Sequence, residues 1–361
     1  YLDEIDVLSA PMPSLGPQAR KWSVYQNGWQ SWSPAFARHL GNGLYGTPGT
    51  QSYRRLHQPH WRSEADGVIS SEWVTVVSTW GTQGRASLLA GFVTAKDQLA
   101  EIRVEENGTK LVARCYFDNI RLDPGESVSS EFLVVQAGPD PLKLLEWWAD
   151  EAGREMKARV PVVGWEHWGT NCYALDCTHP DALQWLSETF KCMRQEWQVS
   201  YFKIDFLFAA ALPGKHHDRA ATRAQALRQG VETIRKAIGK KSFLLGCGAP
   251  LGPCVGLVDG MRTGPDVDPN WHPIWRNDLT SVSTQNALRN VMTRAPFHGR
   301  LWANDPDCLL MRPRSDDMDL TLNEMRSLAS FVALSGGLTF DSDDLQTVDS
   351  GRIKYLRQTL P

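Results

Sequence analysis

One lysine and one aspartate interrupt an aromatic and apolar run at residues 201–208. The aromatic and β-branched residues of this run are typical of a buried strand. Because side chains alternate along a strand, Lys203 and Asp205 would project from the same face near its C-terminal end. A buried ion pair is a poor way to stabilise a core, so this pair indicates a functional site. A structural Lys–Asp pair at a strand end is the alternative for this stretch taken alone.

A second pair of charged residues, Arg262 and Asp266, follows an apolar run at 255–258. Gly264 and Pro265 lie between them and are typical of a turn, so both charges are expected where strand becomes loop. Barrel enzymes place their chemistry at such strand ends. Two carboxylates on neighbouring parallel strands are what a retaining glycosidase needs. One attacks the anomeric carbon, and the other protonates the leaving oxygen and then activates water.

The two motifs, Lys-x-Asp at 203–205 and Arg-x-x-x-Asp at 262–266, resemble the catalytic motifs of the α-galactosidase (melibiase) clan. Gly-Cys-Gly-Ala-Pro at 246–250 and Phe-Leu-Phe-Ala-Ala-Ala at 206–211 are similar to glycoside hydrolase family 36. Both motifs occur in order with Gly-Cys-Gly between them, which makes the resemblance specific. It extends from about Trp165 to Leu345, and more loosely through Gly28-Trp29-Gln30-Ser31-Trp32-Ser33.

The resemblance implies a retaining exo-α-galactosidase that needs no cofactor. Such an enzyme cleaves terminal α-linked galactose from oligosaccharides by double displacement through a galactosyl-enzyme intermediate. Asp205 would be the nucleophile, kept dry by its aromatic neighbours and ionised by Lys203. Asp266 would be the acid/base, and we expect the nearby carboxylate to raise its pKa so that it starts protonated. The resemblance assigns substrate contacts to Lys203, Arg262, Cys247, Gly248 and Trp168.

Several of these residues also have a plain structural interpretation. Cys247 alone would be a small buried hydrophobic residue, and Trp168 would suit core packing equally well. The resemblance places Cys247 at a strand end that lines the sugar pocket, not as a nucleophile. His216 and His217 lack a third ligand at a usable spacing and are expected at the surface. Four further acidic residues at strand ends could bind hydroxyls or simply be solvated: Asp305, Asp307, Asp343 and Asp344.

Other functions fit the same motifs. Within the resembled family these are an α-N-acetylgalactosaminidase and an α-galactosyl transferase, and the space beside the sugar's second carbon would separate them. A non-catalytic sugar-binding relic is the hypothesis from a different class. Because both aspartates and their basic partners are retained, and a binding protein needs no general acid, the enzyme is favoured. Its expected partners are galactose-containing oligosaccharides, and a homo-oligomer would fit the family.

The composition excludes several functional classes. The chain has 361 residues, a formal net charge of -3 and no basic block, so nucleic acid is not an expected partner. No apolar run is long enough to span a membrane. The seven cysteines are scattered without a zinc-binding spacing, which favours a reduced, cytoplasmic protein without a metal.

The order of strand and helix signals predicts a multidomain α/β protein. Residues 1–138 carry strand-like runs and turns without a long helical periodicity, which predicts an antiparallel β-sandwich. Residues 139–160 are expected to form a helical connector that begins at Asp140-Pro141, an N-cap followed by proline. Residues 161–361 alternate between strands and helices and predict a catalytic TIM-type (β/α)8 barrel.

Two stretches of the predicted sandwich could reach beyond it. Gln30, Ser31 and Trp32, together with the aromatic and basic run at 53–61, could touch a substrate or a neighbouring subunit. Packing within the sandwich is the alternative. The Asn-Gly pair within residues 106–109 predicts a hairpin, because both turn positions accept positive φ.

The predicted barrel is incomplete by count. About six strands are expected after residue 159, whereas a complete barrel has eight. No Asp-Asp pair of the kind that the resembled family carries after its first barrel strand occurs between Trp165 and Tyr201. We therefore expect two or three βα units to be absent, because either the barrel is reduced or the chain is incomplete. The expected strands are 160–164, 201–208, 242–245, 255–261, 300–303 and 338–340, and the expected helices are 183–197, 224–238, 284–292 and 321–335.

Overall fold

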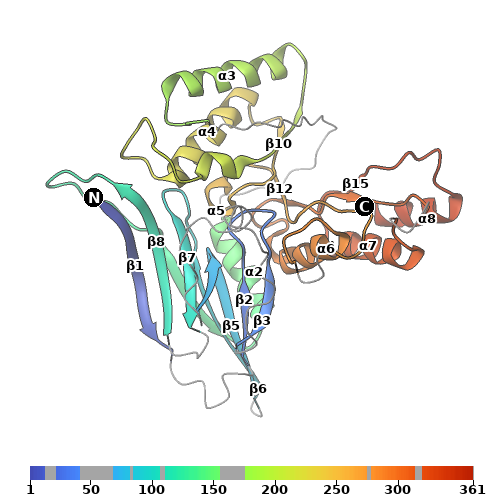
Figure 1. Cartoon of the computed structure of the whole chain (residues 1–361), viewed down its shortest axis with the longest axis horizontal. Helices are drawn as coiled ribbons and strands as arrows, with labels where there is room; N and C mark the ends of the chain where they lie inside the picture. The colour runs from blue at the N-terminus through green and yellow to red at the C-terminus, as the bar shows by residue number, and fades with distance from the viewer. Residues whose placement is uncertain are drawn as a thin grey trace.

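Two antiparallel sheets make up the N-terminal part of the protein (Figure 1), for which the computed structural model describes residues 1–12, 22–40, 68–81, 84–105, 110–154, 175–274, 278–313 and 319–360. The strand orders are β1-β8-β7-β4 and β3-β2-β5-β6-β9. The first sheet contains β1 (Leu2–Pro11), β4 (Val68–Glu72), β7 (Leu99–Glu105) and β8 (Lys110–Ile120). The second contains β2 (Trp22–Gln26), β3 (Phe36–His39), β5 (Val74–Gly81), β6 (Gly84–Phe92) and β9 (Leu133–Gly138).

The inner faces of the two sheets form one hydrophobic core. Ile102 and Val104 of β7 belong to the same buried cluster as Val74 and Val76 of β5. In each strand these residues stand two apart, so their side chains point to one face. The antiparallel architecture predicted for this part of the chain is confirmed. The predicted hairpin at 106–109 and the run at 53–61 lie outside the described residues.

A parallel sheet follows in the C-terminal part. Its strands are β10 (Tyr201–Ile204), β11 (Phe243–Gly246), β12 (Gly260–Arg262) and β13 (Ala303–Asp305), paired in that order. Two short strands, β14 (Cys308–Leu309) and β15 (Phe340–Asp341), form a separate parallel pair. The chain entering β15 lies beside β13, because the Leu338 N–H donates to the Asn304 carbonyl oxygen at 2.8 Å. Because β10, β11, β12 and β13 pair in parallel, their carboxyl ends lie at the same edge of the sheet.

Helices connect these strands, as the alternating pattern predicts. They are α2 (Pro141–Ala152), α3 (Pro180–Gln195), α4 (Arg223–Ile238), α5 (Leu251–Cys254), α6 (Thr284–Thr293), α7 (Leu322–Ser335) and α8 (Ser350–Thr359), with 3-10 turns η2 (Leu207–Ala211) and η3 (Ala295–Phe297). The predicted cap of α2 is confirmed, since Asp140 accepts backbone N–H bonds at its start; Thr321 likewise caps α7, and Gly239 ends α4. None of the described helices is long and apolar enough to cross a membrane.

Several predicted boundaries are wrong. The expected strand at 201–208 stops at Ile204, because Phe206 adopts a left-handed φ of 56° and turns the chain into η2. The apolar run at 255–261 is a strand only from residue 260, since the residues before it form α5 and a turn. Trp197, the last residue of the expected helix 183–197, lies beyond α3 and is 63% exposed.

The described parallel strands do not form a closed eight-stranded barrel. Four strands pair in one sheet and two in another, within the part of the chain that the structure describes. The expected first strand at 160–164 lies outside the described residues. The described residues thus support a mixed α/β fold with antiparallel sheets followed by parallel ones.

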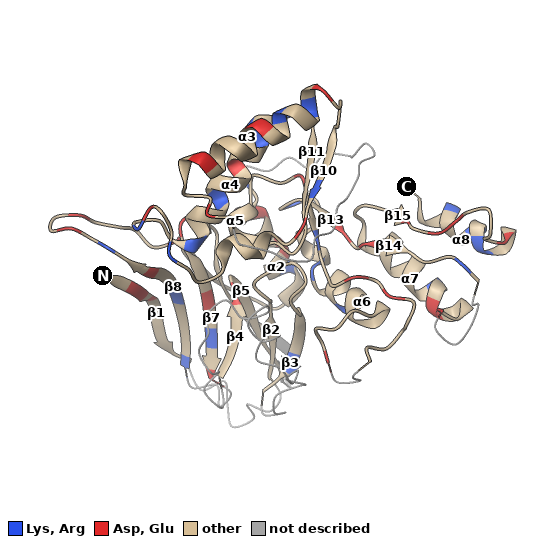
Figure 2. Ribbon diagram, turned by 45° about the horizontal axis from the view of Figure 1, so that its top comes forward, with Lys and Arg blue, Asp and Glu red and all other residues tan. Residues whose placement is uncertain are grey.

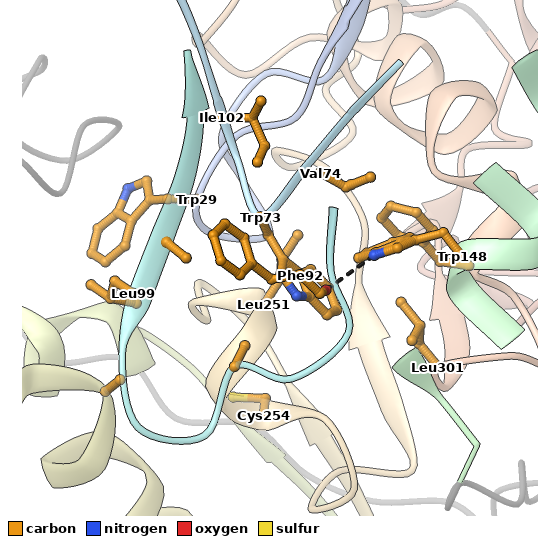
Figure 3. Close-up of a cluster of buried hydrophobic side chains, with 14 of the residues drawn as sticks. Trp29, Trp73, Val74, Phe92, Leu99, Ile102, Trp148, Leu251, Cys254 and Leu301 are labelled. Carbon is orange, nitrogen blue, oxygen red and sulfur yellow. Dashed lines mark hydrogen bonds between the residues drawn. The ribbon is translucent and has the colours of Figure 1, made fainter. Parts of the chain in front are cut away.

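Helix α2 joins the two parts through a buried aromatic cluster (Figure 3). Its Trp148 is fully buried and donates its indole N–H to the Phe92 carbonyl oxygen at 3.0 Å. The Trp148 ring meets Trp73 edge-on, with centroids 4.6 Å apart, and lies 5.7 Å from the Phe297 ring on η3. A Cβ on Gly91 would come within 2.6 Å of the Trp148 indole nitrogen, so this close approach requires glycine. The predicted connector helix is therefore packed into the junction.

Candidate active site

The left-handed turn after β10 fixes the position of Asp205. Because β10 ends at Ile204, Asp205 follows directly at the strand's carboxyl end, and its Oδ1 accepts the Phe206 N–H at 2.8 Å. Lys203 lies within β10, half-buried and opposite Leu245 of β11. The turn that shortens the predicted strand thus places the carboxylate where strand becomes loop.

The segment after β11 lies against the turn after β10. The Phe208 N–H donates to the Gly248 carbonyl oxygen at 2.7 Å, which ties η2 to the Gly-Cys-Gly segment. Gly248 has a φ of +52°, and a Cβ there would lie 3.0 Å from the ring of Trp32 and 3.2 Å from the Phe206 nitrogen. Any larger residue would therefore be both strained and crowded. Cys247 beside it is fully buried.

Arg262 at the end of β12 connects the acidic residues of the site. Its side chain is only 3% exposed, and its Nη2 lies 2.7 Å from Asp266 Oδ1 and 2.6 Å from Asp307 Oδ2. Its Nη1 points at the Cys247 sulfur, 3.8 Å away. One guanidinium therefore bridges the segments that follow β11, β12 and β13.

The charges of this cluster depend on each other. Burial alone would lower the pKa of Arg262, but Asp307 and the other carboxylates raise it well above its usual value, so the guanidinium stays charged. Burial raises the pKa of the Cys247 thiol far above its ordinary value; Arg262 and Lys203 lower it, whereas Asp205 raises it. Cys247 is thus a neutral thiol at neutral pH, as expected of a residue that lines a pocket and is not a nucleophile.

Two aspartates after β13 complete the acidic side of the site. Asp305 is 1% exposed, and burial raises its pKa, opposed by the positive charges of Arg262 and Lys203. Its Oδ1 accepts the Asp307 N–H at 2.8 Å. Figure 2 shows this acidic segment, in red, between β13 and β14. Asp305 and Asp307, considered above as hydroxyl ligands or solvated residues, surround Arg262.

The N-terminal part contributes one wall of the site through Trp32. The Trp32 ring meets Phe206 edge-on, with centroids 5.0 Å apart, and lies 6.0 Å from Phe208. Its segment pairs with the loop after β11, since the Ser31 N–H donates to the Ala249 carbonyl oxygen at 2.9 Å and Gln30 bridges to Pro250. This segment therefore packs across the junction as well as inside the sandwich.

Arg294, which the sequence analysis did not single out, holds this segment in place. It is 1% exposed and donates to the carbonyl oxygens of Ser31, Ser33 and Thr263, at 3.1 Å to Ser33 and 2.8 Å to Thr263. Asn290 adds a bond to Ser33 at 3.0 Å. Burial lowers the pKa of Arg294 to about 10, so it remains charged at neutral pH. No motif marks this residue, because its acceptors are backbone atoms far away in the chain.

The structure gathers five of the seven residues assigned to the site by sequence. Asp205, Cys247, Gly248, Arg262 and Asp266 lie on consecutive strand ends joined by the contacts above. Lys203 acts on the same cluster through its charge. Trp168 lies outside the described residues. Asp266 is 44% exposed and ion-paired with Arg262, a contact that favours its charged form, whereas the sequence analysis expected a neighbouring carboxylate to dominate.

The remaining polar candidates lie in structural contacts or at the surface. The Asp343 side chain is fully buried and accepts the Arg312 N–H at 3.0 Å, and Asp344 is exposed. His217 is exposed, and the His216 ring lies 3.3 Å from Asp176. Among the residues that the structure describes, no group of three or more histidine, cysteine or acidic side chains could hold a metal ion.

This geometry can be compared with that of known proteins. No protein-family model matches the chain. The chain is 22% identical to TtGalA, the α-galactosidase of Thermus thermophilus, solved in complex with stachyose, with a TM-score of 0.70 over 99% of this chain and 94% of that one. A complex of TtGalA with p-nitrophenyl α-D-galactopyranoside gives 21% identity and a TM-score of 0.68, over 95% and 86% of the two chains.

The chain has the fold of these α-galactosidases. A doubly substituted variant of the GH36 α-galactosidase AgaA of Geobacillus stearothermophilus, solved in complex with raffinose, is 11% identical with a TM-score of 0.53. That match covers 97% of this chain and 61% of AgaA. The predicted resemblance is thus confirmed at the level of the fold. An α-galactosidase fold does not by itself establish activity, so the function must be argued from the site.

Proposed function

We propose that this protein is a retaining exo-α-galactosidase that removes terminal α-linked galactose from oligosaccharides. One observation carries the proposal: the ends of adjacent parallel strands bring Asp205 and Asp266 into one cluster, with Arg262 and Cys247 between them. Two carboxylates held at the carboxyl ends of parallel strands suit a double displacement at an anomeric carbon.

In the first step the Asp205 carboxylate attacks the anomeric carbon and the bond to the leaving oxygen breaks. Asp266 gives its proton to that oxygen, so the aglycone departs as a neutral alcohol. In the second step Asp266 takes a proton from water, the water oxygen bonds to the anomeric carbon, and the Asp205 ester bond breaks. Two inversions restore the original α configuration.

The surrounding residues supply substrate contacts in this proposal. Lys203 and Arg262 bind sugar hydroxyls, and Cys247 and Gly248 form the floor beside them. The Nε of Arg262 and the indole N–H of Trp32 are buried and have no hydrogen-bond partner among the described residues. The half-buried ring of Trp32 offers an apolar face to the sugar ring. Trp168 keeps its proposed place in the wall.

The experiment that tests the proposal follows hydrolysis of p-nitrophenyl α-galactoside by the purified chain, with proton NMR detection of the first galactose released. We expect α-galactose to form first and mutarotation to follow. The β-galactoside and the α-N-acetylgalactosaminide serve as matched substrates and should react at least about a hundred times more slowly. A folded chain that hydrolyses none of them, or one that releases β-galactose first, would contradict the proposal.

A further inference from the structure

Asp307 is fixed by contacts on both of its sides. It has a left-handed φ of 76°, a conformation that few residues other than glycine adopt. Its Oδ2 accepts the Val267 N–H at 2.8 Å and lies 2.6 Å from Arg262 Nη2, while its own N–H donates to Asp305. The carboxylate is 16% exposed. A left-handed backbone and a half-buried carboxylate held by two partners at one residue indicate a specific role.

The nitrogen that Asp307 contacts is the nitrogen that also contacts Asp266. Arg262 Nη2 lies between the two carboxylates, at 2.6 Å and 2.7 Å. A positive charge at this distance favours the ionised form of a carboxylate. A general acid must instead hold a proton near its working pH. Arg262 alone would therefore work against the role proposed for Asp266.

We propose that Asp307 is a positioning residue that takes up part of the charge of Arg262 and so lets Asp266 hold its proton. The inference rests on the proposed function, because it explains how the acid of that mechanism is kept competent. Asp307 also fixes the backbone next to Asp266 through Val267. Its own negative charge acts directly on Asp266 in the same direction, since like charges disfavour ionisation.

The two cysteines beside this pair carry no charge at neutral pH. Cys247 is neutral because its thiol pKa is raised by burial, and burial likewise raises the pKa of Cys308 to about 11. Both thiols therefore stay neutral over the pH range in which Asp266 should titrate. Among the described residues, the charged and titratable groups that act on this cluster are Lys203, Asp205, Cys247, Arg262 and Asp305 at the ends of β10 to β13, and Cys308 in β14.

Replacing Asp307 by asparagine separates its charge from its geometry. The amide oxygen of Asp307→Asn can still accept from Val267 and Arg262, but the negative charge is gone. The positive charge of Arg262 then acts more strongly on Asp266. The pKa of Asp266 should fall, so that it loses its proton at lower pH. We expect the alkaline limb of the kcat/KM profile to move down by about one pH unit. Activity above that limb should fall about tenfold, while the value on the acid side should stay within about threefold.

Asp259→Asn is a matched control at the opposite end of the same strand region. Asp259 Oδ2 also accepts from an arginine, Arg235, and from a backbone N–H, that of Leu244 at 2.8 Å, and its carboxylate is 14% exposed. This variant should lower stability but leave the alkaline limb in place. An equal shift in both variants, or none in Asp307→Asn, would overturn the proposal.

A second measurement needs no turnover. With aspartate labelled by carbon-13 at the side-chain carboxyl, NMR can follow the titration of Asp266, assigned by its loss in Asp266→Asn. Its midpoint should be about one pH unit lower in Asp307→Asn than in the parent. If the parent protein has no hydrolytic activity, the proposed function is overturned, but the titration of Asp266 can still be measured. An unchanged midpoint in a folded Asp307→Asn protein would overturn the role of Asp307.

Discussion

The indole ring of Trp32 lies against the α-carbon of Gly248, so that a segment from the N-terminal sheets touches the loop after β11. A Cβ on Gly248 would lie 3.0 Å from two ring carbons. The proposed sugar site is thereby assembled from both parts of the chain. Glycine is required at this contact for two reasons, space and the left-handed φ of +52°.

Gly248→Ala should therefore disturb the site more than the fold. The left-handed backbone costs about 1–2 kcal/mol in stability, and the ring of Trp32 must move away. We expect kcat/KM for p-nitrophenyl α-galactoside to fall at least about tenfold. Gly239→Ala is the control, because Gly239 has a similar φ of +74° but no atom within 4 Å of the added carbon. Its ψ of 170° lies in a region that essentially only glycine adopts, so Gly239→Ala should lose at least as much stability by urea unfolding, with unchanged kcat/KM. Equal kinetic losses in both variants would contradict this account.

Arg294→Met should weaken the contact between the N-terminal sheets and the C-terminal parallel sheet. The variant leaves the buried carbonyl oxygens of Ser31 and Thr263 without their donor, and each unsatisfied group costs about 1–3 kcal/mol. We expect a loss of at least about 3 kcal/mol in the free energy of unfolding, measured with urea. Arg121→Ala removes an arginine whose side chain is 65% exposed, in a surface ion pair, and should change stability by less than about 0.5 kcal/mol. A loss below about 1 kcal/mol for Arg294→Met would show that these hydrogen bonds contribute little.

Local signals predicted the helices well. Thr321 begins a capping box that the structure contains, and Asp140 caps α2 before its proline. These contacts join residues two or three apart, so the sequence displays them directly. Strand lengths were less predictable. Val258 and Cys254 are buried in the same cluster although neither lies in a strand, because burial favours apolar residues whatever the backbone conformation.

The sequence motifs predicted which residues form the site, but not which of these residues contact each other. Lys-x-Asp and Arg-x-x-x-Asp identified the residues that now lie on adjacent strand ends. Nothing in the spacing indicated that Asp307 would share a guanidinium nitrogen with Asp266. That contact depends on the register of β12 against β13, in which Arg262 is opposite Asp305. Long-range pairing of this kind is fixed by the tertiary structure alone.

Asp266→Asn should distinguish a general acid from a mere ligand. A nitrophenolate leaves without much help, whereas the sugar alcohol released from melibiose needs a proton. We expect kcat/KM for melibiose to fall about a hundred times more than kcat/KM for p-nitrophenyl α-galactoside. Added azide should restore turnover of the nitrophenyl substrate and give α-galactosyl azide, because it attacks the same face as water. Equal losses on both substrates would indicate that Asp266 only binds the sugar.

Asp341 should make stability depend on pH. Burial raises its pKa to about 6, its Oδ2 has no partner among the described residues, and Asp343 lies beside it. A raised pKa means that the native state binds the proton more tightly, so stability is lost as pH rises from about 4 to about 6. Asp341→Asn escapes this loss and should be more stable than the parent by about 1 kcal/mol at pH 7, after allowance for solvent screening.

Urea unfolding of parent and Asp341→Asn at pH 4 and pH 7 tests this prediction. The two proteins should be nearly equal in stability at pH 4, because the folded carboxyl is protonated there and the loss of stability has only begun. An advantage of the same size at both pH values would show that the effect does not come from ionisation.

The central claim is that Asp205 is the nucleophile, and chemical rescue tests this claim most directly. In Asp205→Ala, hydrolysis of p-nitrophenyl α-galactoside should fall by about three orders of magnitude or more. Azide fits the space of the lost carboxylate and attacks the same face of the anomeric carbon. We expect it to restore nitrophenol release and to give β-galactosyl azide, identified by NMR. Rescue that gives the α-azide, or a variant that keeps most of the parent's activity, would contradict the assignment of Asp205.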